Sequence, residues 1–516
     1  MADTKKYFVV VADPKDKLTV HQELSNSECV DPMPYSLHNG IFMLTAEEVS
    51  TLTNDPRIKA VHLTAAELGL IRSPSGIRSG NFSKLEFTTS TQLNWALPRC
   101  ISGIENFLGN NHLSEYTFNL NGTDVDIVIF DTGVEPGHPE FAVNEDGSGG
   151  SRVVDYDWTQ TGVITSAPTG GFLGDVDGHG THVASIVAGN TNGWASNANI
   201  YSLRVTATET FVPVGPPANG NSIYDNRALS YVDEFQAWQA VRIFHQDKSV
   251  NPATGYKNPT VVMAAYSYLD TYQRGNIISF NYRGTTISEG IATGETTGAI
   301  RVADGGSGYL PTRYAALDAE VSSTVDAGVI VIGAAGNEYH KIDVVGGDDY
   351  NNYWIDNQGY FHYYHRGASP SAADGVICVG ASSWALPEHK YSFSNTGPRV
   401  DMFAPGGLIV GAYGPSPYIY DSIPDPRNTD YYLNSLIGTT QASAQVGGMV
   451  AMLAQLRPWY TCTDVLSWLT NYGPKDRLLE SYYQLEGTYT NFSSLQGAVN
   501  VFPNMVYNLP YSITFT

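Results

Sequence analysis

Basic residues are scarce in this chain of 516 residues. Only 28 lysines and arginines stand against 51 aspartates and glutamates, which gives a formal net charge of −23. Charged residues make up only 15% of the chain, so the imbalance is chiefly a shortage of lysine and arginine. Proteins that track a nucleic-acid backbone need basic groups to displace counterions from the phosphates. The composition therefore argues against a nucleic-acid partner.

Long apolar runs and cysteines are also scarce. No apolar stretch approaches the roughly 18 residues of a membrane-spanning helix, so we expect no membrane partner. The N-terminal sequence MADTKKYFVVVADPKDK has too short an apolar stretch, and no small-residue cleavage pattern, for a secretory signal. The cysteines are too scattered for metal-ligand spacing or a disulfide framework, which is typical of a reducing or indifferent compartment. They are Cys29, Cys100, Cys378 and Cys462.

What the chain does contain is enough apolar material for a large core. Hydrophobic residues make up 42% and aromatic residues 12%, with 33 tyrosines and 51 glycines, so wholesale disorder is excluded. Residues 1–70 are predicted to form a small α+β unit, with strands at 6–12, 40–46 and 58–63 and a helix at 46–54. A Ser-, Gly- and Thr-rich linker follows at 71–98. The main domain is expected at 99–475, and a β-rich extension at 476–516.

In the main domain, near-continuous apolar strands alternate with helices. This pattern predicts an α/β fold with a doubly wound, mostly parallel sheet that helices cover on both faces. Ligands bind at the carboxyl ends of the strands in such folds. The predicted strands are 124–130, 198–205, 259–265, 327–335, 374–382 and 400–406, and the predicted helices are 180–189, 232–246, 316–327, 442–456 and 462–472. Long connections with little periodicity, at 206–231, 270–313, 341–373 and 411–436, are expected to be functional or interaction surfaces.

Two polar residues at element ends are candidates for acid–base chemistry. Asp131 directly follows an apolar strand and precedes Thr132-Gly133, where either an orienting carboxylate or an ordinary turn residue would sit. The Asp-Thr-Gly triplet also occurs in aspartic proteases, but those need a second aspartate to share a proton with the first. The chain contains no second Asp-Thr-Gly or Asp-Ser-Gly triplet. His179, in DGHGTHVASIVAG, opens an apolar helix and suits either a general base or a structural role. His179 and His182 are three residues apart, so the pair lacks both the four-residue spacing and the glutamate of a zinc protease helix.

Two more residues suit oxyanion binding and nucleophilic attack. Asn337 follows the apolar strand GVIVIGAA, where a side-chain amide can stabilise a developing oxyanion, although an ordinary turn asparagine is the alternative. Thr440, in GTTQASAQVGGMVAML, lies at a helix N-terminus. A hydroxyl there is either an N-cap or a nucleophile favoured by the positive end of the helix dipole.

Together these motifs resemble those of the subtilisin-like serine proteases, the subtilases. VDIVIFDTGVEPGHPEF resembles the Asp motif of this family, DGHGTHVASIVAG its His motif, AAGN its oxyanion motif and GTTQASAQVGGMVAML its nucleophile motif. The resemblance covers roughly residues 95–475 and implies a subtilisin-like fold with Asp131, His179, Asn337 and Thr440 as catalytic residues. Residues 5–66 resemble the inhibitory prodomain of the family. AGNEYHKIDVVGGDDYNNY and HRGASPSAADGVICVGA resemble subtilases encoded by tailed phages.

The chain departs from the family pattern at the site itself. Thr440 stands where the family has its catalytic serine, and Gln441 and Ala444 replace the usual methionine and proline. The substrate-binding strand, S-L-G or S-W-G in the family, becomes Ala265-Tyr266-Ser267, which is expected to narrow the first specificity pocket. Ser443, three residues along the helix, cannot substitute because it is rotated away by about 300°.

We therefore expect a pseudoprotease, meaning a subtilase scaffold kept as a structural or binding component of a phage particle. Its partners would be virion subunits or a peptide in the cleft, and its location the virion, or the host cytoplasm before assembly. An active endopeptidase with Thr440 as nucleophile is the alternative, and a peptide-binding module that does not cut is a third. No cofactor is expected. Calcium would fit the family, but the acidic stretches 347–352 and 233–236 lack EF-hand spacing and are expected to be solvated loops.

Overall fold

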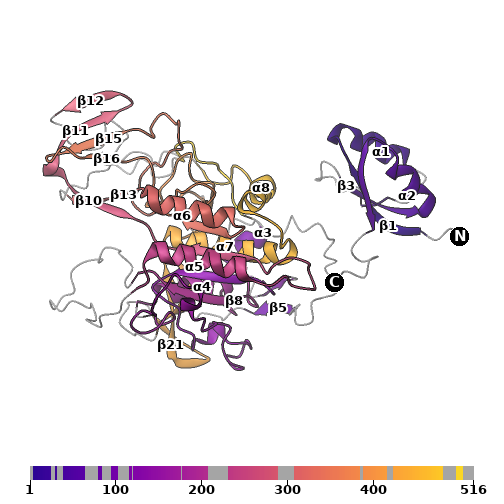
Figure 1. Cartoon of the computed structure of the whole chain (residues 1–516), viewed down its shortest axis with the longest axis horizontal. Helices are drawn as coiled ribbons and strands as arrows, with labels where there is room; N and C mark the ends of the chain where they lie inside the picture. Colours follow the sequence, from indigo (N-terminus) through magenta and orange to yellow (C-terminus); the bar gives the residue numbers. More distant parts are fainter. Residues whose placement is uncertain are drawn as a thin grey trace. The chain divides into compact units, whose positions relative to one another are not determined.

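The computed structural model describes residues 4–24, 29–31, 39–63, 80–83, 95–102, 115–118, 120–175, 177–206, 231–288, 307–383, 388–414, 422–479 and 495–503. The chain divides into two compact units, Met1–Ile77 and Arg78–Thr516 (Figure 1). Each is described by itself. No helix in these ranges is both long and apolar enough to cross a membrane.

The first unit is a four-stranded antiparallel sheet with two helices. The strand order is β2-β3-β1-β4. A capping box between Thr45 and Glu48 starts the second helix at the residue where the sequence predicts it. The elements are β1 (Thr4–Val11), α1 (Lys17–Glu23), β2 (Cys29–Asp31), β3 (Asn39–Thr45), α2 (Ala46–Thr53) and β4 (Ile58–Leu63).

The second unit is built on a six-stranded sheet whose neighbours are all parallel. Its order is β18-β17-β14-β9-β7-β8. Each strand lies inside a predicted apolar run or within one residue of it, so the expected doubly wound parallel sheet is confirmed. The strands are β7 (Asp126–Asp131), β8 (Asn199–Arg204), β9 (Thr260–Ala264), β14 (Ile330–Ala334), β17 (Ile377–Ser382) and β18 (Met402–Pro405).

Helices cover both faces of this sheet (Figure 1). Alternate residues of β7 point to opposite faces: Ile127 and Ile129 join a core with α4, α7 and α8, while Val128 and Phe130 join a core with α5 and α6. This two-sided burial explains why the strands are near-continuous apolar runs. The helices are α4 (His179–Ala188), α5 (Glu234–Asp247), α6 (Ala315–Asp326), α7 (Thr439–Leu456) and α8 (Cys462–Tyr472).

Three of the long connections with little periodicity contain strands, which the sequence pattern did not predict. These strands are short and mostly half-exposed, and they pair among themselves in β12-β11-β15-β16, β10-β13 and β19-β21-β20, so no long apolar run marks them. They are β10 (Leu269–Gln273), β11 (Ile277–Tyr282), β12 (Thr285–Ser288), β13 (Ser307–Pro311), β15 (Tyr353–Asp356), β16 (Phe361–Tyr363), β19 (Ile409–Tyr413), β20 (Ile423–Asp425) and β21 (Asn428–Leu436). Of the connection 206–231, residues 207–230 lie outside the described ranges.

The remaining elements lie outside the sheets and helices described above. Strand β5 (Gly80–Ser83) and the start of α3 (Ala96–Ser102) fall within the segment expected to be a linker, and β5 pairs with β6 (Glu115–Phe118). In the expected C-terminal extension, Val501 forms an isolated bridge with Lys475, while most of 480–516 lies outside the described residues. Short 3₁₀ helices occur at Pro14–Asp16, Pro139–Phe141, Trp158–Thr161 and Arg274–Asn276.

Candidate active site

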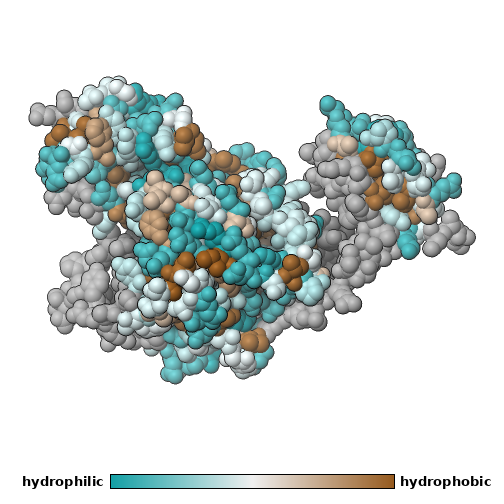
Figure 2. Space-filling model, in the orientation of Figure 1, coloured by the Kyte–Doolittle hydropathy of each residue, from teal (hydrophilic) through white to brown (hydrophobic). Residues whose placement is uncertain are grey.

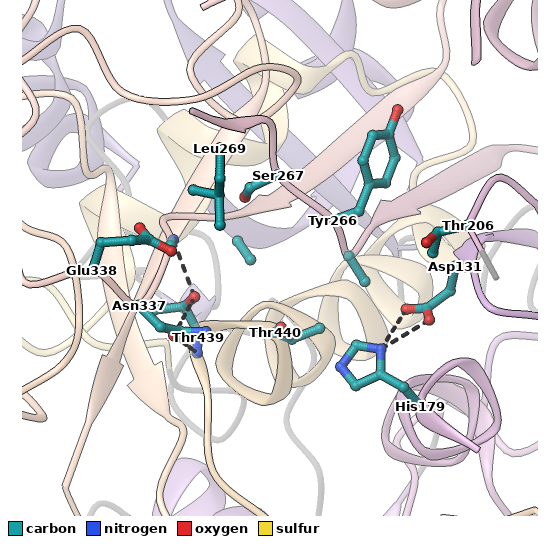
Figure 3. Close-up of a pocket in the computed structure, with 13 residues that line it drawn as sticks. Asp131, His179, Thr206, Tyr266, Ser267, Leu269, Asn337, Glu338, Thr439 and Thr440 are labelled. Carbon is teal, nitrogen blue, oxygen red and sulfur yellow. Dashed lines mark hydrogen bonds and ion pairs between the residues drawn. The ribbon is translucent and has the colours of Figure 1, made fainter. Parts of the chain in front are cut away.

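A cleft enclosing about 520 Å³ of solvent-open space lies at the carboxyl ends of β7, β9 and β14 and the starts of α4 and α7 (Figure 3). All seven site residues that the sequence predicts line it, although they come from segments up to 309 positions apart. This agrees with the rule that parallel α/β sheets place their sites at the strand ends. The lining residues are Asp131, His179, Thr206, Ala265, Tyr266, Ser267, Leu269, Ala334, Gly336, Asn337, Glu338, Thr439 and Thr440.

Asp131 and His179 form a buried pair on one side of the cleft (Figure 3). The His179 Nδ1 atom lies 2.8 Å from Asp131 Oδ1 and 2.9 Å from Oδ2, and both residues are almost fully buried. The carboxylate also accepts a hydrogen bond from the Thr132 main-chain nitrogen at 2.7 Å. A carboxylate at Nδ1 holds the neutral imidazole in the tautomer whose Nε2 can accept a proton. This half of the site can therefore act as a general base.

A second buried carboxylate, Asp175, holds the end of β7 against the start of α4. It accepts hydrogen bonds from Thr132 Oγ1 at 2.9 Å, from Gly178 N at 2.8 Å, and from both the main chain and the hydroxyl of Thr181 at 2.9 and 2.5 Å. Thr132 Oγ1 accepts in turn from Gly180 N at 2.9 Å. Burial raises the pKa of Asp175, and these donors oppose that shift. Asp175 was not predicted as a site residue, although it begins the Asp-x-x-Gly-His segment that ends at His179.

Asn337 lies on the other side of the cleft and is anchored through its side-chain oxygen. Oδ1 accepts hydrogen bonds from both the main-chain nitrogen and the hydroxyl of Thr439, each at 2.9 Å. The same hydroxyl accepts from Gly336 N at 3.1 Å. With Oδ1 occupied by these donors, the Nδ2 amide is the group that Asn337 offers to a ligand oxygen in the cleft.

Thr440 occupies the first turn of α7, between His179 and Asn337 in the view of Figure 3. Its side chain is mostly buried, with 6% exposed. Within the described ranges, no hydrogen bond joins the Thr440 hydroxyl to His179. Ser443 donates to the Thr440 carbonyl at 2.8 Å and is fully buried, so it points into the helix body rather than into the cleft.

The segment Ala265–Ser267 follows β9 and forms a wall of the cleft. The Tyr266 ring packs into the core on the α5 face, and its hydroxyl accepts a hydrogen bond from Trp238 Nε1 at 3.1 Å. Burial raises the pKa of Tyr266 well above its usual value. Trp238 therefore holds this wall in place from behind, and Ser267 adds its side chain to the cleft.

Glu338 brings a carboxyl group to the cleft that the sequence analysis did not identify. Its Oε2 accepts a hydrogen bond from Asn395 Nδ2 at 2.6 Å, while Oε1 is buried without a hydrogen-bond partner among the described residues. Burial is the main reason why the pKa of Glu338 is raised. The side chain faces the same opening as Ser267 and Leu269 (Figure 3).

In the acidic stretch 347–352, which we expected to be a solvated loop, Asp348 is exposed but Asp349 is not. Asp349 is buried and forms ion pairs with Arg283 at 2.7 Å and Lys341 at 2.6 Å, and these partners lower its pKa. In the other stretch, Asp233 caps α5 through Gln236 N. Among the residues that the structure describes, no cluster of three or more His, Cys, Asp or Glu side chains could hold a metal ion.

Comparison with known proteins identifies the scaffold. The family model described as "Subtilase family" matches residues 122–497. A subtilisin-like protease of Coccidioides posadasii is 26% identical over 72% of this chain and 52% of its own length, and cerevisin of Saccharomyces cerevisiae is 25% identical over 72% and 40%. The chain thus spans about half the length of the curated relatives that it matches.

A solved structure described as a cold adapted subtilisin-like serine proteinase is 20% identical over 81% of this chain and all of that one, with a TM-score of 0.47. The family match covers well over half of the chain and contains Asp131, His179, Asn337 and Thr440. The chain therefore belongs to the subtilase family and has a subtilisin-like α/β fold.

Proposed function

We propose that this protein is a pseudoprotease, a subtilase-family protein whose cleft holds a peptide segment of another protein with little or no turnover. The observation that carries the proposal is Thr440, a β-branched residue that lines the cleft at the position where the family has its catalytic serine.

The extra methyl group of threonine explains why turnover would be low. A β-branched side chain is stiff at χ1, so the Thr440 hydroxyl cannot turn freely toward both the base and an incoming carbonyl. A misplacement of about 1 Å can cost roughly 10²-fold in rate. Loss of the nucleophile costs about 10⁶-fold in kcat in subtilisin. The rate penalty for Thr440 lies between these bounds.

The rest of the cleft supports binding. Asn337 still offers its amide, and the wall at Ala265–Ser267 is held from behind by Trp238. Both features position a peptide whether or not it is cut. A scaffold that loses the nucleophile and keeps these groups suits the recognition of a chain segment.

Surface features favour protein partners. Figure 2 shows apolar residues at the surface around β11, β12, β15 and β16, where Ile278, Tyr360 and Phe361 are each more than half exposed. Aromatic residues are enriched in protein–protein interfaces. The resemblance of residues 335–353 and 365–381 to phage-encoded subtilases makes a virion the particle in which we place this role, with virion subunits as partners.

A slow endopeptidase with Thr440 as its nucleophile is the second candidate. The Asp131–His179 pair favours it, because both distances suit a general base that is ready to act. In this case Asn337 would stabilise the oxyanion of the tetrahedral intermediate.

Labelling by a fluorophosphonate probe, read by intact mass, separates the two candidates. The pseudoprotease predicts an unlabelled wild-type chain and rapid labelling of Thr440→Ser, with Thr440→Ser/His179→Ala as the unlabelled control. If wild type is labelled at Thr440 and His179→Ala abolishes the label, the endopeptidase is correct. A silent Thr440→Ser variant would contradict the role given to Thr440 and would place the cause of low turnover in the narrowed wall at Ser267.

A further inference from the structure

Asn395 lies between β17 and β18, does not line the cleft, and is fully buried. Its main-chain nitrogen donates to the Gly336 carbonyl at 2.9 Å, and its Nδ2 donates to the Ala335 carbonyl at 2.9 Å and to Glu338 Oε2 at 2.6 Å. Its Oδ1 accepts from the main-chain nitrogens of Glu338 at 3.2 Å and His340 at 2.7 Å. One residue thus binds the chain on both sides of Asn337.

The loop that Asn395 binds, residues 335–340, has a backbone conformation that is unfavourable without support from its surroundings. Gly336 has φ +100° and Tyr339 has φ +65°, which is in the region that residues other than glycine rarely occupy. A Cβ atom at Gly336 would lie 2.4 Å from Asn395 Nδ2, so glycine permits the close approach of the two segments. Such a loop persists only where its surroundings hold it.

Asn337 is therefore fixed from two directions. Thr439, at the start of α7, holds its side-chain oxygen, and Asn395 holds the main chain before and after it. The first contact selects which end of the amide faces the cleft. The second determines where in the cleft that amide lies.

We propose that Asn395 is the positioning residue of this loop and places Asn337 Nδ2 against an oxygen atom of the bound peptide. The inference rests on the proposed function, because it assumes that the cleft holds a peptide. A charge-assisted hydrogen bond to a carboxylate is roughly twice as strong as a neutral one. The cleft should therefore prefer a peptide that ends in a carboxylate at this point, and Asn395 should control that preference.

Glu338 supplies a sharp way to perturb the contact. In Asn395→Asp the side chain keeps its shape, but an acceptor replaces the Nδ2 donor and faces the Glu338 carboxyl and the Ala335 carbonyl. Two acceptors in contact repel each other, so this variant should displace the loop. Adding Glu338→Gln restores a donor opposite the new carboxylate and should recover part of the wild-type behaviour.

The test uses two fluorescein-labelled peptides, Ala-Ala-Ala-Leu with a free carboxylate and the same peptide ending in leucinol, with binding measured by fluorescence anisotropy. We expect the wild-type protein to bind the carboxylate at least about 10-fold more tightly. Asn337→Leu is the benchmark that should bring this ratio close to one. Asn395→Asp should do the same by weakening the carboxylate peptide much more than the leucinol peptide, and Asn395→Asp/Glu338→Gln should recover part of the ratio.

A purely structural role would weaken both peptides equally and leave the ratio unchanged. The proposal is overturned if Asn395→Asp keeps the wild-type ratio, or if wild type shows no carboxylate preference. Asn395→Ser, which keeps the main-chain bond to Gly336, gives the same decision if the aspartate variant does not fold. Mass spectrometry of the recovered peptides is the separate readout: cleavage contradicts the proposed function and leaves the affinity ratio as the measure of the positioning role.

Discussion

The Nδ1 atom of His179 lies within 2.9 Å of both carboxylate oxygens of Asp131, and both residues are buried. This contact fixes the imidazole in the orientation that leaves its other nitrogen for a proton from a neighbouring hydroxyl. The base is therefore assembled, and under the proposed function it is the Thr440 hydroxyl that limits the reaction.

Asp131→Asn tests this directly in the Thr440→Ser background. An amide at position 131 would favour the wrong imidazole tautomer, and the equivalent change in a serine protease lowers kcat by about 10⁴-fold. We expect fluorophosphonate labelling of Thr440→Ser/Asp131→Asn to be slower than that of Thr440→Ser by a factor of about 10³–10⁴. The thermal midpoint serves as the control for folding, and equal labelling rates would show that Asp131 does not orient the base.

Asp175 should stabilise the folded protein as well as hold β7 against α4 in the site. Asp175→Ala leaves the Thr132 and Thr181 hydroxyls and the Gly178 main-chain nitrogen without their acceptor in a buried place. Each unsatisfied group costs about 1–3 kcal/mol. Urea unfolding should show a free energy of unfolding lower by about 3 kcal/mol or more. Asp175→Asn keeps the volume and one acceptor and should lose less, whereas an unchanged midpoint for both variants would contradict the role.

The sheet and its helices could be predicted because strands that are buried on both faces need apolar residues at nearly every position, which appear in the sequence as apolar runs. Strand β14 is one example, with Ile330–Ala334 all buried. The inserted strands could not be predicted in the same way. Strand β21, NTDYYLNSL, is exposed or half-buried at seven of its nine positions, so its apolar residues give no clear run.

The four residues expected to be catalytic were predictable from motifs, while the residues that hold them in place were not. Asp131, His179, Asn337 and Thr440 each sit in a short segment that resembles a subtilase motif. Asn395 acts on Glu338 from 57 positions away, and that contact arises only when β14 and the segment after β17 fold side by side. No local pattern carries this information.

Lys390 predicts a pH dependence of stability. Its ammonium group is buried and donates to the carbonyls of Tyr391 and Ser394 at 3.1 Å and of Ser392 at 3.4 Å. Burial lowers the pKa of Lys390 to about 7. The unfolded chain, with an ordinary lysine, keeps the proton up to roughly pH 10.5. Between these values the unfolded state binds more protons, so this group makes the protein more stable as pH rises.

Urea unfolding of wild type and Lys390→Met at pH 7, 8 and 9 isolates this effect. The difference in the free energy of unfolding should shift in favour of wild type by about 1 kcal/mol per pH unit. Other titrating groups act equally on both proteins and cancel in the difference. Parallel pH profiles would mean that Lys390 keeps an ordinary pKa in the folded state.

Ser267→Gly should widen the cleft. The family pattern has glycine where Ser267 lines the wall, and removing its side chain frees space beside Leu269 and Glu338. One methylene of pocket space is worth about 1–3 kcal/mol, so the affinity for a peptide with Phe in place of the terminal Leu should rise by about 10-fold relative to one with Ala. Fluorescence anisotropy with the two peptides measures that ratio.

Tyr266→Phe is the matched control for the wall. It removes the hydroxyl that accepts from Trp238 Nε1 on the α5 side and leaves the Ser267 side chain in the cleft. Stability should fall by about 1–2 kcal/mol, while the Phe-to-Ala affinity ratio stays at its wild-type value. If Ser267→Gly also leaves that ratio unchanged, the wall does not limit the size of the peptide side chain that the cleft accepts. The low turnover that we propose would then depend on Thr440 alone.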